Sequence, residues 1–277
     1  MEALIYKREY RKRPEVKEKI QEYNKKIEKE KKVIKIEALV LAAGYGMRLR
    51  PLTEDTPKPL LRVAGKLMVE HIIGKIEEID ASKLYIVTND KFYQNFSEWI
   101  RNFDAKIPIE IINDGTKSNE DRLGAMGDVN FVIKNKNIKE DIVIIAGDNL
   151  FEMSLHEVAN IFNKRKNNVI VLHDVKDREF AKRYGVVEVK GNVVVDFEEK
   201  PVSPKSTLVS TGIYFFPKKT IGLIEKYLSQ GNNPDKTGDF IKWLHKREIV
   251  YAHITDKKWY DIGSFEQLEK ADREFKG

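Results

Sequence analysis

Hydrophobic positions follow two different periods along most of this chain. Short apolar runs, typical of buried strands, occupy residues 38–41, 84–87, 109–112, 142–145 and 169–172. Amphipathic stretches of helical period lie between these runs, at 69–79, 92–103, 123–134 and 158–163. Strands that alternate with helices predict βαβ units, and therefore a mostly parallel sheet with helices on both faces.

The pattern changes in the second half of the chain. Runs at 186–189 and 193–197 flank Gly191-Asn192, which is the spacing of a β-hairpin. Further strands are predicted at 212–216 and 249–254. We therefore predict one α/β domain over residues 36–277, in which an antiparallel extension follows the parallel part.

A very polar segment, residues 1–35, precedes this domain and is predicted to be a helical arm. After Pro14, apolar residues recur on one narrow helix face, at Val16, Ile20, Tyr23 and Ile27. Two heptads are too few for a stable isolated coiled coil, so this seam needs a partner. The arm either docks on the domain or pairs with a second copy, which makes a homo-oligomer an expectation.

The net charge of the chain belongs to the arm. The chain has 50 basic and 44 acidic residues, a net charge of +6. Residues 1–35 hold thirteen basic and seven acidic side chains, so the remainder has 37 of each and is formally neutral. The basic face of the arm could contact nucleic acid, but no aromatic stacking platform accompanies it, and a solvated face is the favoured interpretation.

Composition excludes several classes of site. Without cysteine there is no disulfide, thiolate nucleophile or cysteine-ligated metal. The five histidines are scattered, with no pair at metal-ligand spacing. No apolar run approaches ~20 residues and the start lacks the apolar stretch of a signal peptide, so we expect a cytoplasmic protein without a membrane span. Abundant Lys, Glu and Ile with little Gln resemble thermophile composition.

The most informative segment follows the first predicted strand and reads LAAGYGMRLRPLTEDTPKPL at residues 41–60. Small residues and glycines let backbone amides approach phosphate oxygens, and Arg48 and Lys58 add two cations. The sequence excludes two other phosphate-binding motifs. A Walker A loop needs Ser or Thr after Gly65-Lys66, where Leu67 stands, and a dinucleotide fingerprint needs glycine where Leu49 stands.

As a whole, this segment resembles the signature of the sugar-1-phosphate nucleotidyltransferases, also called nucleoside-diphosphate-sugar pyrophosphorylases. Five further blocks resemble those of the family and come in its order: AGDN at 146–149, RYGVVE at 183–188, FEEKP at 197–201, STGIY at 210–214 and WYDIGS at 259–264. The resemblance spans residues 36–264. It implies a Rossmann-like, GT-A-like fold with a mixed, mostly parallel sheet and an antiparallel sugar-binding extension.

The resemblance also implies a reaction, in which a nucleoside triphosphate and a sugar 1-phosphate give an NDP-sugar and pyrophosphate. Both reactants are anions: at ~4 Å and an effective dielectric of ~20, each pair of unit charges repels by about 4 kcal/mol. Catalysis then consists mostly of positioning and charge neutralisation, and needs no covalent intermediate.

Site residues follow from the matching motif positions. On the nucleotide side, the resemblance implies contacts from Leu41, Ala43, Gly44, Gly46, Arg48 and Gly124. It implies catalytic roles for Arg48, which binds the leaving phosphates, for Lys58, which bridges the reacting phosphates, and for Asp148. Asp148 and Asp261 would hold Mg²⁺, which favours one or two carboxylates with phosphate oxygens and water. On the sugar side it implies Tyr184, Gly185, Glu199, Lys200 and Thr211, whereas Trp259 and Tyr260 are expected to be core.

Two departures from the family pattern limit what the resemblance implies. Met47 stands where the family usually has Thr or Ser, so one hydroxyl contact to phosphate is lost. The stretch at 114–125 lacks the Gln-Pro-x-Pro-x-Gly-Leu-Ala motif of thymidylyltransferases, so the base stays open. We expect glucose 1-phosphate with UTP or dTTP, and no C-terminal β-helix. The alternatives are a CTP-dependent enzyme for phosphocholine or a polyol phosphate, and a catalytically silent regulatory paralogue.

Overall fold

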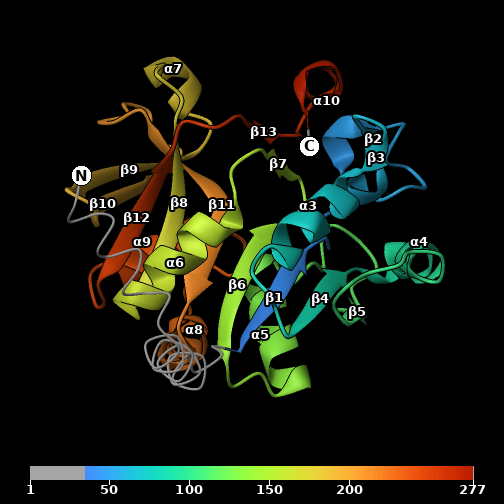
Figure 1. The fold of residues 1–277 in the computed structure, drawn as a ribbon, viewed down its shortest axis with the longest axis horizontal. Helices are drawn as coiled ribbons and strands as arrows, with labels where there is room; N and C mark the ends of the chain where they lie inside the picture. Colours follow the sequence, from blue (N-terminus) through green and yellow to red (C-terminus); the bar gives the residue numbers. More distant parts are fainter. Residues whose placement is uncertain (1–34, 277) are drawn as a thin grey trace, which may run out of the picture. The chain divides into compact units, whose positions relative to one another are not determined.

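The computed structural model describes residues 35–276 of the chain. The helical arm predicted for residues 1–35 therefore lies outside the described residues, except for Lys35. A mixed sheet of nine strands forms the centre of the described part, in the order β5-β4-β1-β6-β11-β8-β12-β10-β9 (Figure 1).

One half of the sheet is parallel. Its strands are β1 (Ile36–Leu41), β4 (Lys83–Thr88), β5 (Ile109–Asn113) and β6 (Asp141–Ala146). β1 lies between β4 and β6, and β5 pairs with β4. β1, β4 and β6 are apolar runs buried on both faces, as expected of a parallel sheet under two helical layers, whereas the edge strand β5 is mostly half-buried. Their carboxyl ends meet along one edge, where open α/β sheets bind ligands.

The other half of the sheet is mostly antiparallel. β11 (Leu208–Phe216) runs antiparallel to both β6 and β8 (Asn168–Asp174), and β12 (Val250–Thr255) is parallel to β8. β9 (Gly185–Lys190) and β10 (Val193–Glu199) form the predicted hairpin. Gly191 in its turn has φ +62°, a left-handed value that glycine adopts without strain.

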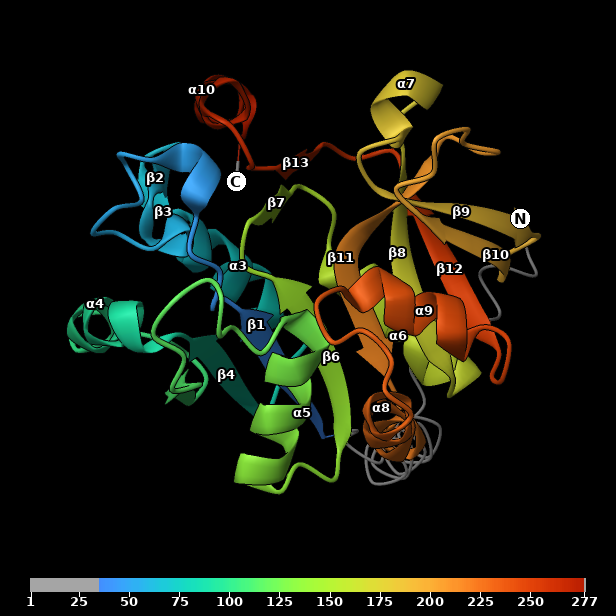
Figure 2. The ribbon, with the colours of Figure 1, turned by 180° about the vertical axis from the view of Figure 1, so that it is seen from behind.

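Helices cover both faces of this sheet. α3 (Met68–Glu77), α4 (Asp90–Ile100) and α6 (Leu155–Arg165) bury apolar residues in one core cluster, which includes Ile72, Phe96 and Phe162. α5 (Ala125–Lys136), α8 (Lys218–Ser229) and α9 (Thr237–Leu244) build the opposite cluster. Figure 1 shows α6 in front of the sheet, and Figure 2 shows α5, α8 and α9 from the other side.

Small elements surround the ligand-binding edge of the sheet. Two single-turn helices, η1 (Met47–Leu49) and η2 (Lys58–Leu60), follow β1, and α7 (Arg178–Ala181) precedes β9. β2 (Arg62–Val63) pairs with β3 (Lys66–Leu67), and β7 (Asn149–Phe151) pairs with β13 (Trp259–Asp261). α10 (Phe265–Glu274) follows β13. The β7–β13 pair brings residues 149 and 261 together although they are far apart in the sequence.

The structure confirms the predicted fold class and the predicted strands of the domain. α5 begins at Ala125 rather than at Leu123, because Gly124 has φ +79° and cannot continue a helix backwards. The hydrophobic pattern did not predict α8, α9, α10 or the short strands β7 and β13. No helix of the described residues combines the length and apolarity that crossing a membrane requires.

Candidate active site

The strand ends of β1 and β6 form the floor of the site. Gly147 donates its backbone N–H to the carbonyl of Leu41 at 2.9 Å. A Cβ atom on Gly147 would lie 2.6 Å from that same carbonyl oxygen, so a side chain would push the two strand ends apart. Glycine here lets both strands deliver their following loops, 42–46 and 148–149, to one pocket.

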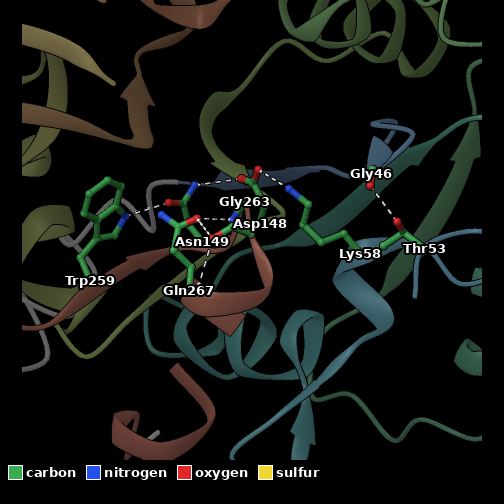
Figure 3. Close-up of polar contacts among 9 residues, drawn as sticks. Gly46, Thr53, Lys58, Asp148, Asn149, Trp259, Gly263 and Gln267 are labelled. Atoms are coloured by element: carbon green, nitrogen blue, oxygen red, sulfur yellow. Dashed lines mark hydrogen bonds and ion pairs between the residues drawn. The ribbon is translucent and has the colours of Figure 1, made fainter. Parts of the chain in front are cut away.

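The loop after β1 is held in a tight turn. Gly46 has φ +62°, and Thr53 donates its hydroxyl to the Gly46 carbonyl at 2.7 Å (Figure 3). Met47 follows with half of its side chain exposed, and the next residue, Arg48, packs its guanidinium against Gly263. A Cβ atom on Gly263 would lie 2.9 Å from a guanidinium nitrogen of Arg48, so a side chain at this position would collide with Arg48. The turn therefore directs Arg48 across the site toward β13.

A chain of polar contacts fixes Asp148, the residue after the Gly147 turn. Lys58 donates to Asp148 Oδ2 at 3.0 Å, and Asn149 donates to Asp148 Oδ1 at 3.2 Å. Trp259 in turn donates its indole N–H to Asn149 Oδ1 at 2.7 Å (Figure 3). One carboxylate oxygen of Asp148 is thus oriented by Lys58 from another segment, and the other by the adjacent Asn149, which Trp259 holds in turn. The ion pair is only partly exposed, which strengthens it relative to a surface pair.

Asp261 lies next to Asp148 in a buried environment. Burial and the neighbouring Asp148 carboxylate raise the pKa of Asp261 to about 6, although the cations Lys58, Arg48 and Lys200 oppose this shift. Three cations thus surround two carboxylates, which leaves the centre with an excess of positive charge that suits phosphate groups. These two aspartates could hold a divalent ion together with phosphate oxygens and water, which is the ligand set that Mg²⁺ prefers. The described residues contain no cluster of three or more acidic or histidine ligands.

Glycines make room for Glu199 on the other side of the site. A Cβ atom on Gly185 would overlap Phe197 and lie 3.1 Å from Glu199 Oε2, and one on Gly238 would overlap the same carboxylate. Burial raises the pKa of Glu199, and the cations Lys236 and Lys200 oppose it. Lys236 Nζ lies 3.9 Å from Glu199 Oε1. The carboxylate is therefore buried, fixed and able to accept hydrogen bonds from a bound hydroxyl.

Three further predicted residues line the same side. Lys200 follows β10 in a left-handed conformation with φ +48°, which is uncommon for a residue with a side chain, and its N–H donates to the Tyr184 carbonyl. Tyr184 packs edge-on against Trp259, with ring centroids 5.2 Å apart. Thr211 is buried and donates its hydroxyl proton to the Val171 carbonyl at 3.0 Å. A ligand could therefore only donate a hydrogen bond to the Thr211 oxygen, not accept one from it.

Two adjoining pockets gather nearly all the predicted residues. We call the pocket at the end of β1 the nucleotide pocket; Leu41, Gly44, Gly46, Lys58 and Asp148 line it. We call its neighbour the acceptor pocket, and Asp148 lines both pockets. The predicted residues that line the acceptor pocket are Arg48, Asp148, Tyr184, Gly185, Glu199, Lys200, Thr211 and Asp261.

Two residues predicted to contact the nucleotide do not line either pocket. Ala43 is buried, and its carbonyl accepts a hydrogen bond from Asn89. Gly124 packs against Pro234 and Asp235, and its neighbour Ala125 lines both pockets instead. Both residues therefore shape the site through their neighbours in this structure.

The sequence interpretation missed three parts of the site. Asn149 was part of a recognised block but had no role assigned, although it orients Asp148. Trp259 was expected to be core, like Tyr260, but it is only half-buried and lines the acceptor pocket. The segment 235–238 also lines the acceptor pocket. Its sequence offers only one signal, Gly238 just inside a helix, where glycine is unfavourable unless space is needed.

Comparison with known proteins gives a consistent family. The family model described as nucleotidyl transferase matches residues 37–276. The bifunctional protein GlmU of Methanocaldococcus jannaschii is 33% identical over 229 residues, which cover 82% of this chain and 51% of that protein. The chain thus spans about half the length of this relative. The UTP–glucose-1-phosphate uridylyltransferase AglF of Haloferax volcanii is 31% identical over 185 residues, covering 65% of this chain and 72% of AglF.

Solved structures show the same fold. A UDP-glucose pyrophosphorylase complexed with UDP-glucose superimposes with a TM-score of 0.72 at 22% identity, covering 86% of this chain and 97% of that chain. At this identity the likeness concerns the fold alone. The family model and the curated relatives settle the family independently of it, and they confirm the resemblance found in the sequence. This chain belongs to the nucleotidyl transferase family.

Proposed function

We propose that this chain transfers a nucleotidyl group from a nucleoside triphosphate to a sugar 1-phosphate and releases pyrophosphate. One observation carries the proposal: three cations and two carboxylates from four separate segments meet where two pockets join. These residues are Arg48, Lys58, Lys200, Asp148 and Asp261. Such an arrangement suits two phosphate groups that must approach each other against their mutual repulsion.

The nucleotide pocket suits a triphosphate. The Gly44–Gly46 turn leaves its backbone open to phosphate oxygens, and Lys58 projects into the pocket beside Asp148. Arg48 reaches from the same loop into the acceptor pocket. We infer that Lys58 neutralises the α-phosphate and that Arg48 offsets charge on the departing pyrophosphate.

The acceptor pocket suits a phosphorylated sugar. Lys200 supplies a cation for the phosphate, and the Glu199 carboxylate accepts hydrogen bonds from ring hydroxyls. Gly185 leaves the space that Phe197 and the Glu199 carboxylate occupy, because a Cβ atom there would collide with Phe197, and we infer that its backbone lies beside the ring. An oxygen of the acceptor phosphate then attacks the α-phosphorus, the bond from that phosphorus to the bridging oxygen of the β-phosphate breaks, and pyrophosphate leaves.

Asp148 and Asp261 would hold Mg²⁺ in this scheme. The donor set fits, since a buried carboxylate pair beside a phosphate site matches the ligands that this ion takes. When bound, Mg²⁺ supplies Lewis-acid neutralisation of the phosphate oxygens. The residues of the chain itself orient the two aspartates, through Lys58 and Asn149 on Asp148 and through burial of Asp261.

The substrates we expect are glucose 1-phosphate with UTP or dTTP. The test incubates the protein with Mg²⁺, each of ATP, GTP, CTP, UTP and dTTP, and a panel of sugar 1-phosphates, phosphocholine and inositol phosphate. Pyrophosphate release that depends on one sugar 1-phosphate is the expected result. Release with phosphocholine or inositol phosphate alone would contradict the sugar assignment, and silence of the folded protein across the panel would contradict the activity.

A variant connects this activity to the site. Asp148→Asn keeps the shape of the side chain and loses its charge, so we expect the fold to persist and turnover to fall by at least about 100-fold. Glu140→Gln, an exposed carboxylate elsewhere on the domain, is the matched control and should keep full turnover. A fully active Asp148→Asn protein would exclude Asp148 from the catalytic centre.

A further inference from the structure

The segment Pro234–Gly238, which we call the bridging segment, touches both pockets from one side. Asp235, Lys236, Thr237 and Gly238 line the acceptor pocket. Thr237 also lines the nucleotide pocket, and its hydroxyl lies 3.0 Å from the hydroxyl of the buried Tyr214. A change in this segment therefore alters the walls of both pockets at once.

The bridging segment is attached to the first turn of α5. Ala125 and Met126 donate their N–H groups to the carbonyls of Asp235 and Pro234, at 3.3 and 2.8 Å. A helix begins with backbone N–H groups that lack partners within the helix, and here the bridging segment supplies the acceptors. Gly124 allows the contact, because a Cβ atom there would lie 2.6 Å from Asp235 Cα.

An ion pair adds a second attachment, from the loop that precedes α5. Arg122 donates from Nε to Asp235 Oδ1 at 3.0 Å and from a terminal nitrogen to Asp235 Oδ2 at 3.3 Å. The same guanidinium donates to the Asn119 carbonyl. Paired contacts of this kind fix orientation as well as distance. Arg122 thus ties the loop at 114–124 to the bridging segment.

The other end of the bridging segment contacts the sugar side. Lys236 lies 3.9 Å from Glu199, and Gly238 leaves the space that the Glu199 carboxylate occupies. A continuous set of contacts therefore runs from Arg122 and Ala125, through the bridging segment, to Glu199. Ligands in the two pockets would therefore contact the same short segment of backbone, which has two attachments to α5 and the loop before it.

We propose that the bridging segment couples the two substrates, so that a bound nucleotide increases affinity for the acceptor, with Arg122 as the positioning residue of this coupling. The inference rests on the proposed function. A nucleotide in contact with Ala125 and Thr237 holds the bridging segment in place, with Arg122 fixing Asp235 from the loop before α5, and the acceptor then finds Lys236 and Glu199 already positioned. Linkage makes the effect reciprocal, so the acceptor raises nucleotide affinity by the same factor.

The experiment measures binding by calorimetry, with the non-cleavable α,β-methylene analogue of UTP and with glucose 1-phosphate, each alone and with the other present at saturation. In the wild type we expect each compound to bind about 5- to 10-fold more tightly when the other is present. Arg122→Ala should lose most of this factor and raise the KM for the acceptor, while kcat changes less than 2-fold. Arg122→Lys, which keeps the charge without the paired contact, should restore only part of it.

Lys134→Ala is the matched control, since Lys134 forms an exposed ion pair with Glu225 that also ties α5 to another element. It should leave the coupling factor unchanged. Equal affinities with and without the second compound in the wild type, or an unchanged factor in Arg122→Ala, would overturn the coupling while turnover in the substrate panel leaves the proposed function standing. A wild-type protein that binds neither compound and is silent in the panel would instead overturn the proposed function, and the coupling with it.

Discussion

Two pairs of aspartates, the partly exposed Asp148 with Asp261 and the buried Asp114 with Asp128, show how surroundings separate a proposed reactive site from a structural one. The first pair lies at the ligand-binding edge of the sheet, beside Lys58 and two other cations, and lines an open pocket. The second lies under the loop that follows β5. Burial and the proximity of Asp114 raise the pKa of Asp128 to about 8, and no neighbouring cation opposes this increase.

The second pair resolves its repulsion with a proton instead of with cations. Asp114 Oδ2 and Asp128 Oδ1 are both buried, and no described residue outside the pair donates a hydrogen bond to either oxygen. With its pKa raised to about 8, we expect Asp128 to carry a proton at neutral pH, which allows its carboxyl to donate to Asp114. The other oxygen of Asp114 accepts from the backbone and side chain of Thr116, both at 2.7 Å, and Thr116 lies near the Tyr45 hydroxyl. The same residue type is thus placed among cations in one pair and beside another carboxyl, without a cation, in the other.

The largest effect is expected when the cation that contacts Asp148 is removed. Lys58→Ala removes the cation that contacts Asp148 at 3.0 Å and that projects into the nucleotide pocket. We expect kcat to fall by about 10²- to 10³-fold, because charge neutralisation between the reacting phosphates is lost. Steady-state kinetics measure the change, and circular dichroism checks the fold. Lys83→Ala removes a lysine that pairs with Glu110 on the domain surface and should leave kcat unaltered.

A smaller effect is expected when Asp261 loses its charge. Asp261→Asn relieves the repulsion from Asp148 but leaves a single carboxylate for the metal. We expect the Mg²⁺ concentration for half-maximal turnover to rise by about 10-fold or more. A second measurement follows the melting temperature, whose increase on addition of Mg²⁺ with UTP should shrink in the variant. An unaltered Mg²⁺ requirement would remove Asp261 from the metal site.

The smallest expected effect tests the second pair through stability. Because the pKa of Asp128 is raised in the folded state, the folded protein binds more protons than the unfolded chain between about pH 4 and pH 8. Its stabilisation is complete below the unfolded pKa and is lost as the pH rises through about 8. Since one pKa unit corresponds to about 1.4 kcal/mol, we expect the wild type to lose about 2 kcal/mol or more between pH 5 and pH 8.

Asp128→Asn should flatten this dependence, because the amide donates to Asp114 without titrating. At pH 8 the variant should then melt roughly 4–8 °C above the wild type. Asp104→Asn, at an exposed position, controls for the loss of one charge. Parallel melting curves of wild type and Asp128→Asn over the whole pH range would show that Asp128 titrates normally.

Much of the fold followed from local pattern, and its gaps have a physical cause. The buried strands of the parallel half are uninterrupted apolar runs such as 142–145, which few other structures accommodate. β7 and β13 have three residues each, too few for a period to show. α8 is an ordinary amphipathic helix with a basic start, but β-branched and polar residues dilute its pattern. Such short elements form because backbone hydrogen bonds and packing with a neighbouring segment stabilise them.

The candidate site was also predictable from the sequence only in part. The glycines and cations of 44–58 and the Asp148 turn could be identified from the chain, because close phosphate approach demands particular residue types at short spacing. The sequence alone could not show that Trp259 orients Asn149, and Asn149 in turn Asp148, because Trp259 and Asn149 are 110 positions apart. Gly124 shows the same limit: the pattern placed it inside a helix at 123–134, and neither its position before α5 nor its contact with Asp235 was predicted.

The sequence alone determined the alternation of strands and helices, the phosphate-binding loop, the family and the residue types available for chemistry. These are properties of short segments, in which backbone sterics and hydrophobic period act between near neighbours. Only the tertiary structure decided which aspartates meet cations and which share a proton, and which segment joins the two pockets. Those outcomes depend on burial and on charges brought within a few ångströms from distant parts of the chain, and the free energy of a charge changes steeply over that range.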